Sequence, residues 1–288
     1  MPTYELKDDR VAEYFAAARE RYEILLRRRN GDPKPWTDDP IFREWYFCNV
    51  FREDDKVTTW IREKVRTPLH DSPSVMWAMA LCRLINKVET LEILRKARVF
   101  ETKLFDGIRT AEALRGVKPI VGAAYVVKTP DGMDKLSGVI SMAHAVSRDH
   151  QDIITRLEGQ TTLQQMWQIV QRFPCFGSFM AYEVTSDLRW TYLLENAPDI
   201  TTWAAPGPGA CLGLSKLTAQ KVRYGTRRDR IAAIEAMQRL VVLSRVEELW
   251  PKKWPRWEMR EAEHWLCEYA KYVKVKREGK RMKRRYSG

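Results

Sequence analysis

The sequence contains few histidines, no pair of cysteines at metal-ligand spacing and no long apolar segment. Four histidines, with no CxxC pair among five cysteines, predict that there is no structural zinc site. The cysteines are odd in number and far apart, which is typical of a reducing cytoplasm and not of a disulfide framework. No segment approaches the roughly 18 consecutive apolar residues of a membrane span, and the first residues, Met-Pro-Thr-Tyr-Glu, do not resemble a signal peptide. We therefore expect a cytoplasmic protein with no membrane partner.

The charge is strongly positive. The 288 residues carry a formal net charge of +12, with a pI of about 9.5, and 44% of them are hydrophobic. A hydrophobic fraction of this size is that of a folded protein. A basic folded chain favours a nucleic-acid partner, because phosphates are the most abundant anions that such a surface binds.

The apolar residues recur mostly at helical spacing. Helices are predicted over 11–30, 40–66, 74–98, 144–158, 161–173, 177–188, 211–221, 228–249 and 258–274, with shorter ones between 101 and 117. Residues 119–140 differ, because two β-prone runs flank a Pro130-Asp-Gly turn and predict a β-hairpin. We expect a single helical domain over residues 1–273, with a division into two helical lobes left open, and a basic tail over 274–288.

Two glycine turns each precede a predicted helix. Gly177 and Ser178 form the first, and Gly207 and Gly209 form the second. A helix start presents unpaired backbone N–H groups and the positive end of the helix dipole, which together bind anions. We therefore place DNA phosphates at both turns, with Lys216 nearby. The second turn lacks the Gly-Lys-Ser/Thr of a Walker A motif, which argues against a P-loop kinase.

Several segments of the chain resemble a known family. The segments that carry the resemblance are 43–61, 84–91, 122–125, 176–188, 206–210 and 260–272. They resemble the thymine-hypermodification branch of the helix-hairpin-helix DNA glycosylase superfamily. That branch includes α-glutamyl/putrescinyl thymine pyrophosphorylases, also called amino acid:DNA transferases, and the helical domain of 5-hydroxymethyluracil DNA kinases. The resemblance implies a mostly α, DNA-glycosylase-like helical fold, here with the small hairpin near 119–140. Ala270 and Cys211 depart from the expected pattern and put local contacts in doubt.

A polar group on the predicted helix 40–66 is the expected wall of a base pocket. Its members are Arg43, Tyr46, Asn49, Arg52 and Glu53. From the pattern alone these residues read as a solvated helix face, and the resemblance reverses that interpretation. Tyr182 and Lys271 are added as substrate-binding residues, and Lys271, Arg43 or Arg52 would neutralise a leaving group.

Three acids are the candidate catalytic residues. Asp187 lies in the segment that matches the family motif more strongly. Asp199 follows the helix after the glycine turn at the distance typical of the catalytic acid of glycosylases, but it could also be a helix cap. Glu183 lies one helical turn before Asp187. One of them would accept a proton from an incoming amine. The polar residues of the final helix, including Glu263, Cys267 and Glu268, read as an ion-paired surface stripe.

The resemblance implies a bacteriophage DNA-modifying transferase. It would flip out an activated 5-hydroxymethyluracil base from double-stranded DNA and let an amino acid displace phosphate or pyrophosphate from it. An amino acid is the implied co-substrate, a 5-hydroxymethyluracil DNA kinase is the functional partner, and the host cytoplasm is the location. No metal site is specified, and a divalent or monovalent cation stays open. Two alternatives are a DNA glycosylase acting on a modified pyrimidine and a non-catalytic DNA-binding partner of the kinase.

Overall fold

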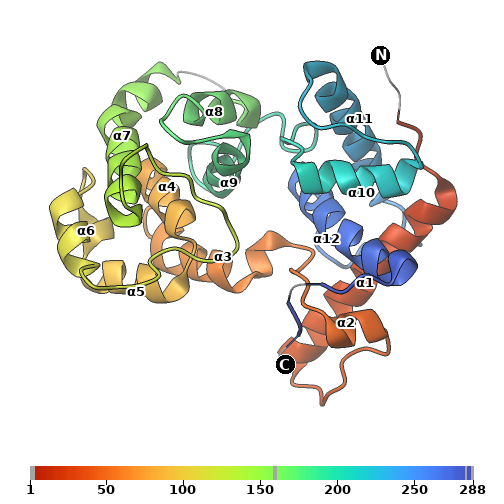
Figure 1. Ribbon diagram of the computed structural model, residues 1–288. Helices are drawn as coiled ribbons and strands as arrows, with labels where there is room; N and C mark the ends of the chain where they lie inside the picture. Colours follow the sequence, from red (N-terminus) through yellow and green to blue (C-terminus); the bar gives the residue numbers. More distant parts are fainter. Residues whose placement is uncertain (1–3, 158–160, 283, 287–288) are drawn as a thin grey trace. The chain divides into compact units, whose positions relative to one another are not determined.

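The computed structural model describes residues 4–157, 161–282 and 284–286, and its regular structure is almost entirely helical (Figure 1). The chain forms two compact units. The terminal unit combines Met1–Asp55 with Thr201–Gly288, and the central unit is Lys56–Ile200. The expectation of a mostly α protein is confirmed.

The terminal unit is built around the packing of α10 on α12. Its elements are α1 (Asp8–Asn30), α2 (Pro40–Glu44), the 3-10 turn η1 (Arg52–Asp54), α10 (Pro208–Thr218), α11 (Arg227–Leu243) and α12 (Met259–Glu278). Gly213 lets α10 and α12 approach closely, since a Cβ added there would lie 2.2 Å from the carbonyl oxygen of Leu266. Buried rings fill the core, and Tyr14 meets Trp257 edge to face with ring centroids 5.8 Å apart.

The central unit surrounds one fully buried helix. Its elements are α3 (Lys56–Ile61), the π-helical turn η2 (Arg62–Arg66), α4 (Val75–Ile85), α5 (Val88–Lys96), η3 (Val99–Glu101), α6 (Gly107–Ala113), α7 (Lys135–Arg156), α8 (Leu163–Val170) and α9 (Ser178–Leu188). Every residue of α4 is buried, because α7 and α9 pack against it (Figure 1). Helices α8 and α9 pack on each other across the turn that holds Gly177.

The β-hairpin expected near 119–140 is wrong. Residues 119–134 are turns and irregular backbone with no strand, and α7 begins at Lys135. The carboxylate of Asp134 accepts hydrogen bonds from the backbone N–H groups of Leu136 and Ser137, so it caps α7 where the second strand was expected.

The single long helix expected over 40–66 is also wrong. It is broken at Trp45, whose backbone is extended at φ −114° and ψ 147° and ends α2 after only five residues. Residues 45–50 contain no helix, and short helical pieces resume at Arg52. Some apolar residues of this stretch are buried from extended backbone and others from helix. Their spacing therefore does not indicate a continuous helix.

The end of the chain returns to the segment after α2. Helix α12 continues to Glu278, and Arg285 then forms an antiparallel bridge with Trp45. The backbone N–H of Tyr286 donates to the carbonyl of Glu44 at 2.9 Å. Among the helices that the structure describes, none combines the length and apolar character needed to cross a bilayer.

Candidate functional site

A polar cluster lies in the terminal unit, where the segment after α2 packs on α12. We define it by nine residues: Cys48, Asn49, Arg52 and Asp55 from that segment, with Glu263, His264, Cys267, Glu268 and Lys271 from α12. Five of the nine are buried, with Glu268 only 2% exposed, while Cys48, Asp55 and Cys267 are half-buried and Lys271 is exposed. Buried charged groups need partners, so the contacts within the polar cluster determine its chemistry.

Hydrogen bonds fix the segment on the helix. One carboxylate oxygen of Glu268 accepts the backbone N–H of Cys48 at 3.1 Å. The imidazole Nε2 of His264 lies 3.1 Å from the carbonyl oxygen of Asn49. A carbonyl can only accept, so Nε2 carries the hydrogen and Nδ1 is the basic nitrogen. The Asn49 backbone N–H donates to the Asp55 carboxylate at 2.9 Å.

Burial shifts the two acids toward the neutral form. Desolvation raises the pKa of Asp55 to about 6, although the hydrogen bond from the Asn49 backbone and the charge of Arg52 oppose the shift. Desolvation also raises the pKa of Glu263 against the nearby charges of Arg260 and Arg52 and the hydrogen bond from the Gly207 backbone. Carboxyl groups with raised pKa values are effective proton acceptors near neutral pH.

The two bases shift in opposite directions. Burial, followed by the positive charges of Arg52 and Arg260, lowers the pKa of His264 well below its ordinary value. This imidazole is therefore neutral at physiological pH. Burial alone would lower the pKa of Lys271, but the carboxylate of Glu268, 2.5 Å from its Nζ, outweighs burial and the pKa is raised. The polar cluster thus combines a neutral imidazole with fixed cations.

Three members of the polar cluster could hold a metal ion. One ligand atom each from Cys48, Asp55 and His264 lies within 4.8 Å of the others. Sulfur, oxygen and nitrogen donors with a fourth position left open suit zinc. Metal binding to the His264 Nε2 would require loss of its hydrogen bond to Asn49. The spacing in the sequence gave no sign of this group, because His264 is more than 200 residues away from Cys48 and Asp55.

The second glycine turn meets the polar cluster directly. The Gly207 N–H donates to the Glu263 carboxylate at 3.2 Å, so this amide binds a side chain of the protein itself. A Cβ added to Gly209 would lie 2.7 Å from the sulfur of Cys267. Lys216 forms an ion pair with Glu278 at 2.7 Å. Close packing on Cys267 therefore accounts for the glycine at 209, whereas a Cβ added to Gly207 would come no closer than 3.4 Å to the Glu263 carboxylate.

The first glycine turn lies in the central unit and is open. A Cβ added to the exposed Gly177 would meet no atom within 4 Å, and Ser178 is half-buried behind it. Steric demand does not require glycine here. The N-terminus of α9 is accessible at Gly177, and its role in phosphate binding stays a prediction.

The acids of α9 are buried within the central unit. Asp187 is 1% exposed and accepts two hydrogen bonds from Arg83, each at 2.5 Å. Arg66 adds a third cationic nitrogen at 3.5 Å from the same carboxylate. Glu183 accepts the hydroxyl of Tyr125 at 2.7 Å, and Tyr182 is buried on the same helix. Glu183 and Asp187 thus each have a partner of opposite character on another segment of the central unit.

Asp199 caps a helix, although that helix is α8 and not one that begins at Ile200. Its two carboxylate oxygens accept the backbone N–H groups of Leu163 at 2.7 Å and Gln164 at 3.0 Å. Both amides belong to the first turn of α8, where a negative charge is favourable. The helix that it caps precedes it by more than 30 residues, which a local reading could not foresee.

The remaining predicted residues of this stretch are Arg43 in α2, Tyr46 in the segment after it and Glu53 in η1. Arg43 donates to the Thr37 carbonyl at 2.5 Å and pairs with Asp38 at 2.6 Å. The guanidinium of Arg284 lies 3.9 Å from the centre of the Tyr46 ring. Glu53 is half-buried in η1. Of the predicted substrate-binding group, Asn49, Arg52 and Lys271 therefore belong to the polar cluster, and Tyr46 lies near enough to Cys48 and Asp55 for their charges to add to the burial that raises its pKa.

The chain is similar to one protein family and to a curated phage protein. A family model described as the helical domain of 5-hmdU DNA kinase matches residues 8–282. A 5-hmdU DNA kinase of Bacillus phage SP10 is 28% identical over 286 residues, covering 90% of this chain. The match spans only 44% of that kinase. No solved structure matches the chain.

Proposed function

Because this chain belongs to the family of 5-hmdU DNA kinase helical domains, we propose that it modifies 5-hydroxymethyluracil in phage DNA. The family model covers residues 8–282, so it includes both units and every residue of the polar cluster. This breadth is the observation that carries the proposal. The relative is a kinase more than twice as long as the matched region, and the proposed step is one that follows phosphorylation.

The proposed reaction is transfer of an amino acid to the activated base. The amine nitrogen forms a bond to the exocyclic methylene carbon of the uracil. The carbon–oxygen bond breaks, and its electron pair leaves with the phosphate or pyrophosphate. The ammonium of the amino acid must lose one proton before attack, and the secondary ammonium formed by the attack then loses a second proton to give the neutral amine. The leaving group must meet positive charge.

The polar cluster supports this chemistry. His264 is neutral, so its Nδ1 lone pair can accept a proton, and the raised pKa of Glu263 makes its carboxylate a stronger base than an ordinary one. The positive charge of Arg52 acts on both groups. It disfavours protonation of His264 and favours deprotonation of Glu263. Arg52 and Lys271 would therefore neutralise the departing phosphate, as expected for these two residues.

The acids of the central unit remain alternative proton acceptors. Asp187 and Glu183 are buried with partners, and Asp199 is half-buried at the start of α8. Replacing each by its amide keeps the shape of the side chain. A loss of transfer with intact folding would assign the role to that acid in place of the polar cluster.

Nucleoside mass analysis tests the proposal. The protein is incubated with kinase-treated 5-hydroxymethyluracil DNA and single amino acids, and the DNA is then digested to nucleosides. A nucleoside heavier by an amino acid, with the sugar bond whole and phosphate or pyrophosphate released, is the expected product. Abasic sites would instead support the glycosylase alternative, and unchanged DNA with every amine would support a binding partner of the kinase.

A matched pair of histidine variants provides the control. His264→Gln removes the basic nitrogen of the polar cluster, and His144→Gln removes an exposed imidazole of α7. We expect only the first to lose the heavier nucleoside while both keep normal thermal melting. Equal activity of the two variants would remove His264 from the reaction.

A further inference from the structure

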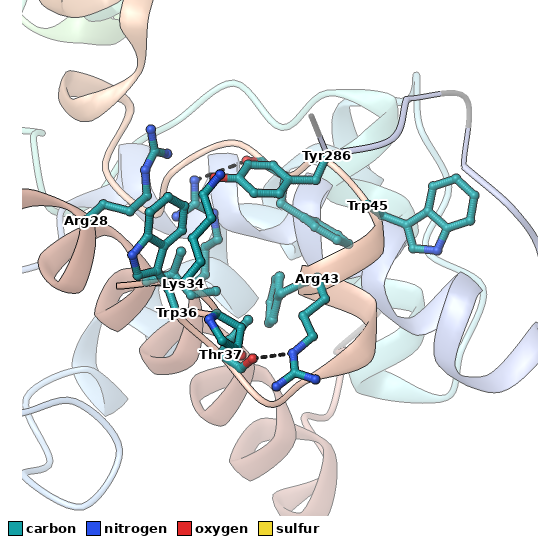
Figure 2. Close-up of a pocket in the computed structure, with 12 residues that line it drawn as sticks. Arg28, Lys34, Trp36, Thr37, Arg43, Trp45 and Tyr286 are labelled. Carbon is teal, nitrogen blue, oxygen red and sulfur yellow. Dashed lines mark hydrogen bonds between the residues drawn. The ribbon is translucent and has the colours of Figure 1, made fainter. Parts of the chain in front are cut away.

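The terminal unit contains a cavity whose lining residues resemble those of a ligand site. The reaction proposed above does not use it. The cavity has a volume of about 210 Å³ and lies among α1, the loop before α2, the segment after α2 and the end of the chain. Trp36, Phe42, Phe47 and Tyr286 supply aromatic walls. Figure 2 shows Arg28, Lys34 and Trp36 together on one side, with the ring of Tyr286 nearby.

A buried guanidinium lines this cavity with part of its hydrogen-bonding capacity unused. Arg21 is only 7% exposed. Its Nη2 donates to the carbonyl of Phe47 at 3.2 Å, but its buried Nη1 has no partner among the described residues. Leaving such a donor unsatisfied is costly. The hydroxyl of Tyr286, which lines the same cavity, is also buried without a partner. A ligand with acceptor oxygens would satisfy both groups.

Cations surround the aromatic walls. The charged groups of Arg28 and Lys34 lie 5.3 and 5.1 Å from the centre of the Trp36 ring. Neither forms an ion pair with a carboxylate in the part of the chain that the structure describes. The residues that line the cavity include four cationic side chains and no acid. The site therefore favours a ligand that combines a planar ring with a negatively charged group.

We propose that this cavity, which we call the Trp36 pocket, holds one unpaired nucleotide of a DNA strand. The base lies against the aromatic walls, a base carbonyl accepts from Arg21 Nη1, and the flanking phosphates bind Arg28 and Lys34. This combination of stacking and backbone charge is how single strands are bound without sequence preference. The volume of about 210 Å³ is below the roughly 300–1,000 Å³ of drug-sized sites and so fits one base. The inference rests on the proposed function only in taking DNA as the ligand.

Binding of an unmodified fluorescent oligothymidylate, measured by anisotropy, tests the Trp36 pocket. Trp36→Leu removes the stacking surface and Arg28→Gln with Lys34→Gln removes the charge. The control pair is Lys252→Gln with Lys253→Gln, two exposed lysines of the same unit. We expect the affinity to fall about tenfold or more in each pocket variant, as for the loss of one stacked base, and less than twofold in the control. Unchanged affinity in both pocket variants, with normal folding, would overturn the inference.

Two further arms separate the possible outcomes. Free thymidine monophosphate should compete only weakly, because it lacks the second flanking phosphate. Competition as strong as that of the oligonucleotide would overturn the assignment to a DNA strand. The oligonucleotide carries no 5-hydroxymethyluracil, so loss of binding in pocket variants supports the inference even if no amino acid is transferred. Transfer with unaltered binding in those variants would contradict the inference and leave the proposed function intact.

Discussion

Arg83 and Asp187 form a two-pronged ion pair inside the central unit, with both nitrogen–oxygen distances at 2.5 Å. Both side chains are at most 2% exposed. The same guanidinium also donates to the hydroxyl of Thr58 at 3.1 Å, which joins α3, α4 and α9 through one residue. A buried pair of this kind is intolerant of losing one partner, because the remaining charge is left without compensation.

The first prediction is that Asp187→Asn destabilises the protein strongly. The change removes the carboxylate charge that Arg83 and Arg66 both contact inside the central unit, and we expect a loss of about 3–5 kcal/mol in the free energy of unfolding. Asp199→Asn removes only part of a helix cap and should cost about 0.5–2 kcal/mol. Urea denaturation measures both. Equal stability of Asp187→Asn and wild type, with lost activity, would favour a catalytic role for Asp187 over a structural one.

The second prediction compares two glycines, of which Gly177 is one that we expect to bind phosphate. Gly213→Ala places a methyl group against the fixed backbone of Leu266 and should destabilise the terminal unit by about 1–3 kcal/mol. Gly177→Ala enters open space and should cost about 1 kcal/mol or less through the weaker N-cap. Thermal melting compares the two. A Gly213→Ala protein as stable as wild type would show that α10 and α12 are packed less tightly than the structure shows.

Much of the helical fold could be predicted because long amphipathic helices carry their own signal. The periodicity over 11–30 and 258–274 matches α1 and α12 closely. The segment 40–66 failed because its aromatic residues are buried from extended backbone and short turns, where apolar spacing carries no information about helix. The hairpin at 119–140 failed because Asp134 is a helix cap, and a cap uses the same residue types as a turn.

The candidate site was only partly predictable. Asn49, Arg52 and Lys271 were identified through the family resemblance, and they meet in the polar cluster. His264 and Glu263 were interpreted as part of a surface stripe, yet they are 9% and 8% exposed. Their burial depends on the segment after α2, which is about 215 residues away in the sequence, so no local pattern could have shown it. The one available signal was the density of titratable residues over 260–271.

The third prediction concerns pH and the start of α12. Burial, with a smaller contribution from Glu258, raises the pKa of Glu261 from 4.5 to about 8. Between these values the folded state holds a proton that the unfolded state has lost, so the stability falls as the pH rises from 4.5 to 8. Glu261→Gln keeps the acceptor of the capping box and removes this dependence. The variant should gain on the order of a few kcal/mol relative to wild type between pH 5 and pH 8.5, at about 1.4 kcal/mol per pKa unit.

Urea denaturation gives the free energy of unfolding of variant and wild type at pH 5 and pH 8.5. Comparing the variant-minus-wild-type difference at the two pH values cancels the contribution of the other titrating groups. Glu44→Gln is the control, because Glu44 is exposed beside α2. Parallel stability–pH curves for Glu261→Gln and wild type would show that Glu261 ionises normally in the folded protein.

The fourth prediction addresses the basic end of the chain. Lys280 and Arg281 follow α12 and are exposed, and replacing both by glutamine leaves Tyr286 in the Trp36 pocket. Each phosphate contact that is lost should reduce the slope of log affinity against log salt by about 0.9 for duplex DNA. We expect a shallower slope and an unchanged nucleoside product. An unaltered slope would place these two cations away from the DNA.

The last prediction joins the pH profile of the reaction to the polar cluster. The pKa of His264 is well below its ordinary value and that of Asp55 is about 6. If His264 accepts the proton of the amine, amino acid transfer should stay constant from pH 8 down to about 6. It should fall only at lower pH, where the imidazole and the Asp55 carboxylate become protonated. His264→Gln should lower turnover by about 10²-fold or more, the scale of a lost general base, while DNA affinity and thermal melting stay normal. Rates measured over this range with saturating DNA provide the check. A rate that already declines at pH 7, with the same profile in His264→Gln, would assign proton acceptance to a group outside the polar cluster.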